Sequence, residues 1–213
     1  MALFSIPTHI NNEVLLQMSK PLLLASSSPF RKELLQRLNL PFETANPDID
    51  ETAFATESPI ELVQRLAHAK AAALANRFSH HLIIGSDQIA VFNNQILGKP
   101  HTEENAFKQL QSFSGSKVMF YTGLSVYDSL ENKHITTVAR YAVYFRILTA
   151  SEIHTYIRKE QPLQCAGSFK SEGLGVCLFE RMEGDDPTSL IGLPLIQLCN
   201  ILREFGVSPL STH

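Results

Sequence analysis

The chain has few cysteines, few charged residues and no long apolar run, and each shortage excludes a class of protein. Its three cysteines contain no Cys-x-x-Cys pair, which argues against a disulfide framework and against a structural zinc site. No apolar stretch approaches the ~20 residues that a membrane helix needs. The first 17 residues hold no lysine or arginine that would begin a signal peptide. We therefore expect a cytoplasmic protein without a membrane partner.

An excess of positive charge is also missing. The 213 residues include 18 lysines and arginines against 21 aspartates and glutamates, for a net charge of −3. Nonspecific nucleic-acid binding depends on a basic surface, so nucleic acid is not an expected partner. A small anion held by a few local cations is still compatible with this composition. The hydrophobic content of 44% is enough to fill a core and argues against a disordered chain.

Four widespread catalytic motifs are absent from the sequence. It contains no Gly-x-x-x-x-Gly-Lys-Ser/Thr phosphate loop, no Gly-x-Gly-x-x-Gly dinucleotide fingerprint, no His-Glu-x-x-His zinc motif and no Gly-x-Ser-x-Gly nucleophile elbow. Function must therefore be judged from the places where polar residues interrupt apolar elements.

Apolar periodicity and turn signals predict strands that alternate with helices, as in an α/β domain. Ser28-Pro29, the capping box Ser58-Pro59-Ile60-Glu61 and a second capping box at residues 149–152 mark three helix starts. Strands are expected over residues 22–25, 82–92, 95–97, 117–127, 135–145, 165–170 and 176–180, and helices over 28–38, 58–78, 102–113, 149–159 and 188–205. The adjacent strands between residues 117 and 145 predict a mixed β-sheet with flanking helices.

Residues 1–19 precede this pattern and are expected to form an N-terminal appendage, with Met18 as an alternative start. Neither an internal repeat nor a low-complexity tract divides the rest of the chain. Prolines and glycines are scattered as in turns rather than gathered into a linker. One domain is therefore expected over residues 20–210.

A polar triplet, Ser86-Asp87-Gln88, interrupts one of the expected apolar strands. An ionised carboxylate in such a strand is costly unless a cation or a metal ion neutralises it. The alternative is a strand that ends at Gly85 and leaves Asp87 in a solvated turn. The apolar pattern resumes at once with Ile89, which favours a buried Asp87 with a cationic partner.

Three cations accompany this acid. Lys70 lies inside the apolar stripe of its helix, where a lysine either extends past the edge into solvent or meets a buried anion. Arg31 follows Ser26-Ser27-Ser28-Pro29 at a helix N-terminus, which offers N–H groups and hydroxyls to an anion, although helix capping alone would explain Ser28. Lys99 lies in a turn, where lysine is usually solvated. With Asp87, these residues predict a cleft suited to a polyphosphate chain and a divalent metal ion.

Two further segments allow both a functional and an ordinary explanation. If residues 165–172 are extended, Ser168, Lys170 and Glu172 share one face of a strand, either beside a ligand or on an exposed edge of mixed charge. The acidic run that contains Glu51 lies in an expected loop, for which a solvated turn is the simpler interpretation.

Taken together, these segments resemble the motifs of the Maf-type nucleotide pyrophosphatases, and they occur in order over residues 22–210. The segments that carry the resemblance are residues 26–31, 50–52, 70, 85–88, 98–100 and 166–173. Residues 81–88 and 165–173 most closely resemble the subfamily that hydrolyses 7-methyl-GTP. The resemblance implies a fold similar to inosine triphosphate pyrophosphatase, with two α/β lobes around a mixed sheet and the site in the cleft.

The resemblance also implies a reaction and a role for each residue. A nucleoside triphosphate and water would give the monophosphate and diphosphate, with Mg²⁺, Mn²⁺ or Co²⁺ as cofactor. By motif position, Asp87 would be the proton acceptor and, with Glu51, a metal ligand, and the cations Arg31, Lys70 and Lys99 would act on the phosphates. The substrate-binding residues would be Ser26, Phe30, Gln88, Lys170 and Glu172. Of these, Phe30, Gln88 and Glu172 fall where the family sets base specificity.

Phe30 marks a departure from the pyrimidine-specific members, which carry a second basic residue at that position. UTP and dTTP are therefore not the first substrates expected. 7-Methylguanine carries a delocalised positive charge, which an aromatic face attracts by roughly 0.5–2 kcal/mol. Glu172 would accept hydrogen bonds from the N–H edge of the base. The alternative is that Phe30 packs inward from its helix.

We therefore expect an enzyme that hydrolyses 7-methyl-GTP to 7-methyl-GMP and diphosphate and so removes modified nucleotides. The alternatives are a nucleotide-binding regulator linked to cell division and a UTP or dTTP pyrophosphatase of the same family. A buried Asp87 favours the enzyme, because a pure binder of polyanions gains nothing from a carboxylate beside its cations. A homodimer is compatible with the sequence, which fixes no oligomeric state.

Overall fold

The structure is a computed structural model that describes residues 20–211. The expected appendage over residues 1–19 and the alternative start at Met18 lie outside the described residues. The strands are β1 (Leu22–Ala25), β2 (Phe42–Ala45), β3 (Leu82–Phe92), β4 (Gln95–Leu97), β5 (Lys117–Asp128), β6 (Lys133–Phe145) and β7 (Phe179–Gly184). The helices are α2 (Pro29–Gln36), α3 (Pro59–Ala72), α4 (Glu103–Phe113), α5 (Ala150–Glu160), α6 (Thr188–Ile191) and α7 (Leu195–Glu204), with 3₁₀ turns η1 (Ala166–Ser168) and η2 (Leu174–Leu178).

The strands form one mixed sheet in the order β2-β1-β3-β5-β6-β7, and β4 adds to β3. β1 runs parallel to both β2 and β3, whereas β3, β5, β6 and β7 are antiparallel to their neighbours along the rest of the sheet. The sheet with helices on its faces confirms the mixed α/β fold expected from the sequence.

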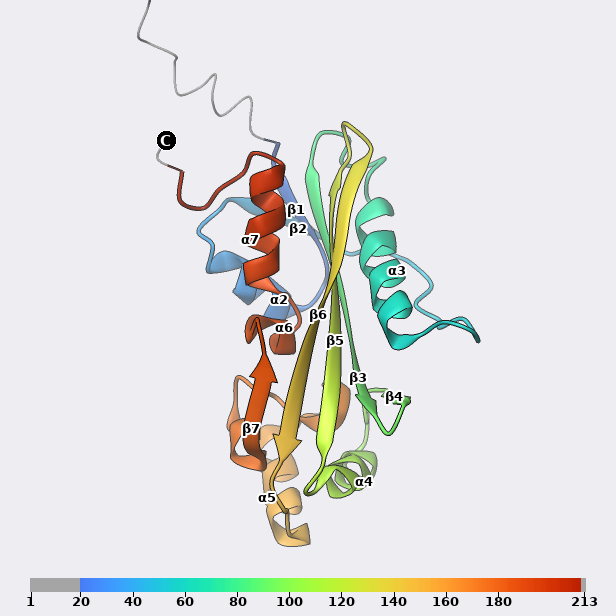
Figure 1. Ribbon diagram of the computed structural model, residues 1–213, viewed down its shortest axis with the longest axis vertical. Coiled ribbons are helices and arrows are strands. Elements are labelled where there is room, and N and C mark those ends of the chain that lie inside the picture. Colours follow the sequence, from blue (N-terminus) through green and yellow to red (C-terminus); the bar gives the residue numbers. More distant parts are fainter. Residues whose placement is uncertain (1–19, 212–213) are drawn as a thin grey trace, which may run out of the picture.

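The long strands β5 and β6 run through both halves of the molecule, and different helices cover the sheet in each half (Figure 1). In one half, α3 lies on one face, and α2 and α7 pack apolar side chains on the other. In the other half, a separate core that includes Phe113, Phe120 and Phe145 lies beneath α4 and α5. Separate apolar cores in the two halves of one sheet agree with the two lobes implied by the resemblance.

Helix α3 lies directly on the sheet because glycines face it on two adjacent strands. A Cβ atom on Gly85 of β3 would lie 2.1 Å from the carbonyl oxygen of Ala67, and one on Gly123 of β5 would lie 2.1 Å from that of Val63. A larger residue at either position would push the helix away. This close packing carries Lys70, in the last turn of α3, over β3.

The predicted helix starts are confirmed. Ser28 caps α2, and Ser58 and Glu61 form a reciprocal capping box at the start of α3. The predicted end of α3 at Phe78 is wrong, because the helix ends at Ala72 and the chain continues in tight turns with hydrogen bonds to carbonyls three residues back. Among the described residues, no helix is both long enough and apolar enough to cross a membrane.

The strand predicted over residues 165–170 is wrong. Gly167 and Ser168 have φ angles of 74° and 60°, which place them in the left-handed region and fold the chain into η1 instead of a strand. Residues 174–178 also form a 3₁₀ turn, so the next strand begins at Phe179 and not at Val176. The shared strand face predicted for Ser168, Lys170 and Glu172 therefore does not exist.

The single closing helix predicted over residues 188–205 is broken in two. Gly192 adopts a φ of 122°, and Pro194 has no N–H for a continuing helix, so α6 ends before a new helix, α7, begins at Leu195.

Strand β2 was not predicted. Its four residues are only partly buried on the sheet edge, which leaves no apolar run to mark it.

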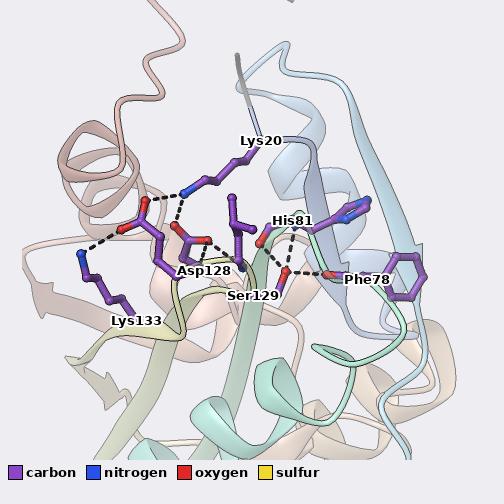
Figure 2. Close-up of polar contacts among 8 residues, drawn as sticks. Lys20, Phe78, His81, Asp128, Ser129 and Lys133 are labelled. Carbon is purple, nitrogen blue, oxygen red and sulfur yellow. Dashed lines mark hydrogen bonds and ion pairs between the residues drawn. The ribbon is translucent and has the colours of Figure 1, made fainter. Parts of the chain in front are cut away.

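A polar network closes the end of the sheet at which β3 begins (Figure 2). Asp128 is buried at the end of β5 and binds Lys20 just before β1. The hydroxyl group of the adjacent Ser129 contacts the carbonyl oxygens of Phe78 and His81 and accepts a hydrogen bond from the amide of His81 at 2.9 Å. These contacts tie the β5–β6 turn to the segment between α3 and β3.

Candidate active site

A gap in the sheet creates a cleft. β1 pairs with one edge of β3 as far as Gly85, and β4 pairs with the same edge from Ala90 onward. β5 occupies the other edge along nearly all of β3. Within the described residues, no strand covers the first edge between residues 86 and 89, and a cleft of about 530 Å³ opens there.

The gap explains how neighbouring residues of one strand serve the same cleft. Side chains alternate along a strand, so Asp87 points toward α3, where it meets Lys70, and Gln88 points toward α6, where it meets Ser189. An unbroken sheet would separate the two faces. Because the gap joins them, both Asp87 and Gln88 line the cleft.

The cleft gathers residues from segments far apart in the sequence. Apart from Lys170, all of the predicted site residues line its walls: Ser26, Phe30, Arg31, Glu51, Lys70, Asp87, Gln88, Lys99 and Glu172. Motifs that are spread along the sequence thus come together in one cleft of the fold.

Lys70 and Asp87 form a buried ion pair at the floor of the cleft. The distance from Lys70 Nζ to Asp87 Oδ1 is 2.6 Å, and the two side chains are 8% and 9% exposed. Lys70 Nζ also lies 2.8 Å from Oε1 of the exposed Glu51, so one ammonium group holds two carboxylates. Asp87 is therefore in the strand and not in a solvated turn, and Lys70 meets a buried anion.

The turn after α6 holds Arg31. The guanidinium Nε donates to the carbonyl oxygen of Gly192 at 2.8 Å, and the buried hydroxyl group of Ser86 lies 2.9 Å from the same oxygen and 2.8 Å from the carbonyl oxygen of Gly123. Burial lowers the pKa of Arg31, and the nearby carboxylates of Asp87 and Glu51 oppose that shift. An arginine has a pKa above about 12 in water, so the group stays cationic at neutral pH.

The other predicted side chains on this side of the cleft differ in exposure. Ser26 is buried, and its hydroxyl group accepts a hydrogen bond from the amide of Ser28 at 3.1 Å. Phe30 is half-buried and lines the cleft, so its ring is available to a ligand. Lys99 is exposed at the cleft rim. Arg31, Lys70 and Lys99 thus surround the cleft with positive charge at different depths.

The structure does not bring Lys170 into the cleft. Its Nζ donates to the carbonyl oxygen of Glu160 at 2.9 Å and lies 3.3 Å from a carboxylate oxygen of the same residue. Ser168 is fully buried and its hydroxyl group binds Gln109. Of the three residues expected on one strand face, Glu172 alone lines the cleft.

Sequence reasoning missed the apolar wall of the cleft and the turn that holds Arg31. Phe120 and Phe169 line the cleft and pack edge to face with ring centroids 5.3 Å apart. Phe120 is one of several apolar residues in a long strand, so no local pattern could single it out. Gly192, which holds Arg31, could have been found, because a glycine two residues before a proline marks a turn.

Cys165 also lines the cleft, but its environment does not suit a nucleophile. Burial raises the pKa of the Cys165 thiol above its ordinary value. The thiolate is the reactive form of cysteine, so a protonated Cys165 is a poor candidate for covalent catalysis at neutral pH.

The donor groups fit one kind of metal site. Glu51 and Asp87 converge on Lys70, and within residues 20–211 no cluster of three or more acidic, histidine or cysteine side chains could hold a metal ion. Mg²⁺ is commonly bound by one or two carboxylates together with water and substrate phosphates. The residues present fit a cation shared with a phosphate ligand and do not fit a site built from protein ligands alone.

Similar known proteins identify the family of the chain. A family model described as Maf-like protein matches residues 21–205. A relative from Pseudoalteromonas translucida named 7-methyl-GTP pyrophosphatase is 57% identical over 196 residues, which are 92% of this chain and 97% of the relative. A second relative of that name, from Colwellia psychrerythraea, is 53% identical over 192 residues, which are 90% of this chain and 96% of the relative.

Among solved structures, the Staphylococcus aureus Ham1 protein matches with a TM-score of 0.42 and 14% identity over 59% of this chain and 72% of that chain. The family assignment depends instead on the sequence match, which covers nearly all of the described residues. From that match we conclude that this chain belongs to the family of Maf-like proteins.

Proposed function

We propose that this protein is a nucleoside triphosphate pyrophosphatase that hydrolyses 7-methyl-GTP to 7-methyl-GMP and diphosphate and so removes a modified nucleotide. Two relatives that match nearly the whole chain carry the name of this activity. The observation that carries the proposal is the buried Lys70–Asp87 pair, 2.6 Å apart, in a cleft ringed by cations.

The cations would bind the triphosphate. Arg31 and Lys99 both line the cleft. Arg31 comes from α2, which precedes Lys70 and Asp87 in the sequence, and Lys99 follows β4, after them. Their positive charge would hold the β- and γ-phosphates and stabilise the charge that develops on the leaving diphosphate. The exposed position of Lys99 allows it to follow the phosphate chain as it leaves.

Asp87 would accept a proton from the attacking water. The water oxygen would bond to the α-phosphorus, the bond between that phosphorus and the bridging oxygen would break, and diphosphate would leave with the bridging oxygen. Asp87 Oδ2 receives no hydrogen bond from the described residues, so it is open to a water molecule, whereas Oδ1 binds Lys70. When bound through Asp87 and Glu51, a divalent cation would polarise the phosphate oxygens.

Phe30 and Glu172 would recognise the base. Both line the cleft, where an aromatic face and a carboxylate complement the positive charge of 7-methylguanine. An uncharged base lacks that charge and would bind less tightly. This residue pair supports 7-methyl-GTP over UTP and dTTP, and the buried Asp87 supports an enzyme over a regulator that only binds nucleotides.

A substrate panel tests the proposal. Release of diphosphate and monophosphate should be measured for 7-methyl-GTP, GTP, UTP and dTTP, each with Mg²⁺, Mn²⁺ and Co²⁺. We expect 7-methyl-GTP to have the highest kcat/KM. Faster hydrolysis of UTP or dTTP would contradict the substrate assignment. A rise in Tm with nucleotide but no diphosphate with any of the three metals would favour the regulator.

A further inference from the structure

The side-chain amide of Gln88 is held by three neighbours. Its Nε2 lies 2.7 Å from the carbonyl oxygen of Ser189, 3.0 Å from that of Leu190 and 3.1 Å from Oγ1 of Thr122. Thr122 is the cross-strand partner of Gln88 on β5 and is 1% exposed. The Thr122 hydroxyl group itself donates to the Ser189 carbonyl oxygen at 2.9 Å.

These partners determine which end of the amide faces the cleft. The nitrogen and oxygen of a glutamine amide are assigned from the hydrogen bonds that they make. Both main-chain carbonyl groups can only accept. The Thr122 hydroxyl group has one hydrogen, and because that hydrogen is donated to Ser189, the hydroxyl oxygen also accepts from Gln88.

All three neighbours are therefore acceptors, and only the NH₂ group of Gln88 can face them. The remaining atom, Oε1, receives no hydrogen bond from the described residues, and Gln88 lines the cleft. The cleft thus presents a carbonyl oxygen at this position, which is an acceptor and cannot donate.

We propose that Thr122 is a positioning residue for base selection, because together with the carbonyl oxygens of Ser189 and Leu190 it holds the Gln88 amide with its own carbonyl oxygen toward the base. This inference rests on the proposed function and adds a substrate class to it. A fixed acceptor binds bases that present a ring N–H, as guanine and hypoxanthine do. It repels adenine, whose ring nitrogen at the same position is an acceptor with no hydrogen.

Inosine triphosphate and ATP provide a matched pair of probes. Hypoxanthine and adenine are alike in size but differ in whether the ring nitrogen N1 carries a hydrogen. Binding measured by calorimetry, which does not need turnover, should favour inosine triphosphate by on the order of tenfold, the usual effect of one unpaired polar group.

Two variants at position 122 separate positioning from folding. Thr122→Val keeps the shape of the side chain but removes the hydroxyl group, so the amide loses one of its three contacts. We expect the preference for inosine triphosphate to fall at least about threefold, the scale of one lost hydrogen bond, with kcat for 7-methyl-GTP within about twofold of the wild type. Thr122→Ser restores the hydroxyl group and should restore the preference.

The outcomes distinguish this inference from the proposed function. An unchanged preference in a folded Thr122→Val protein, or a preference in the wild type for ATP, would overturn the role of Thr122. If the preference responds as expected but 7-methyl-GTP is not hydrolysed, the proposed reaction fails and the positioning role stands.

Discussion

Asp87 and Lys70 show how a buried charge in a small domain is made tolerable. A carboxylate inside an apolar strand loses its hydration, and a nearby cation must compensate. Lys70 does so at 2.6 Å, from a helix that is held on the strand by glycines. The pair need not add to stability as a unit, but removing either partner leaves the other charge buried and alone.

Replacing Lys70 with methionine should therefore destabilise the protein strongly. Methionine keeps much of the side-chain volume but leaves Asp87 without its cation, and breaking a buried ion pair in this way costs about 3–5 kcal/mol. Urea unfolding of Lys70→Met measures the loss. The matched control is Lys99→Met, which removes an exposed cation of the same cleft and should change stability by less than about 0.5 kcal/mol. Equal stability of the two variants would contradict this interpretation of the pair.

Functional residues that break the apolar pattern of an element can be predicted from the sequence, whereas those that fit the pattern cannot. Asp87 and Lys70 could be predicted because each is a charge in an apolar element. Thr122 and Phe120 could not, because a threonine or a phenylalanine in a strand is ordinary. Lys170 was predicted to bind substrate from a strand face, and the turn at Gly167 and Ser168 removes that face.

Among the elements, α3 determines the geometry of the cleft floor. Its closest approach to the sheet is at Gly85 and Gly123, where its main chain lies against the strands. Glycine allows this approach because it has no Cβ. The position of Lys70 therefore depends on two residues that make no contact with a ligand.

Gly85→Ala should displace α3 and separate Lys70 from Asp87. The added methyl group would lie 2.1 Å from a main-chain oxygen, so the helix must move. Overpacking of this kind costs about 1–3 kcal/mol, and kcat should fall along with stability. Gly98→Ala is the control, because an added methyl group there meets nothing within 4 Å. If Gly85→Ala retains wild-type unfolding and turnover, the packing argument is wrong.

A second property of α3 concerns pH. Burial and the neighbouring His134 lower the pKa of His68, whose ring lies 4.1 Å from that of His134 and 5.8 Å from that of Tyr127. As pH falls below about 6.5, an unfolded histidine takes up a proton that the folded His68 resists. Stability should therefore decrease on acidification in that range.

Urea unfolding at pH 7.5 and at pH 5.5 measures this effect. His68→Phe retains a ring but cannot titrate, so its stability should fall less between the two values than that of the wild type. A variant with the same pH dependence as the wild type would show that His68 is not responsible.

Local sequence signals predicted most elements but missed those that depend on distant contacts. The capping boxes at Ser58 and Thr149 act within a few residues, and both are present as predicted. The break at Gly192 also has a local signal, which the apolar pattern of residues 188–205 obscured. Strand β2 exists because β1 pairs with it, and nothing in its four residues requires a strand.

For the whole molecule, the main feature is that the cleft is an interruption in a sheet. β1 ends and β4 begins on the same edge of β3, and on that edge the four residues between them lack a neighbouring strand in the described chain. Motifs distributed from Ser26 to Glu172 meet at this opening. The motifs and their order could be identified from the sequence. The gap could not be predicted, because it depends on how β1 and β4 align with β3, and no single segment specifies that register.

The central claim is that Asp87 performs the chemistry in this opening, and turnover of 7-methyl-GTP by Asp87→Asn tests it most directly. Asparagine preserves the size of the side chain and a contact with Lys70 but cannot take the proton. We expect kcat to fall by at least ~100-fold, with the Kd for 7-methyl-GTP little changed and the free energy of unfolding lowered, because Lys70 loses its buried anionic partner. A folded Asp87→Asn protein that turns over 7-methyl-GTP at close to the wild-type rate would contradict the claim.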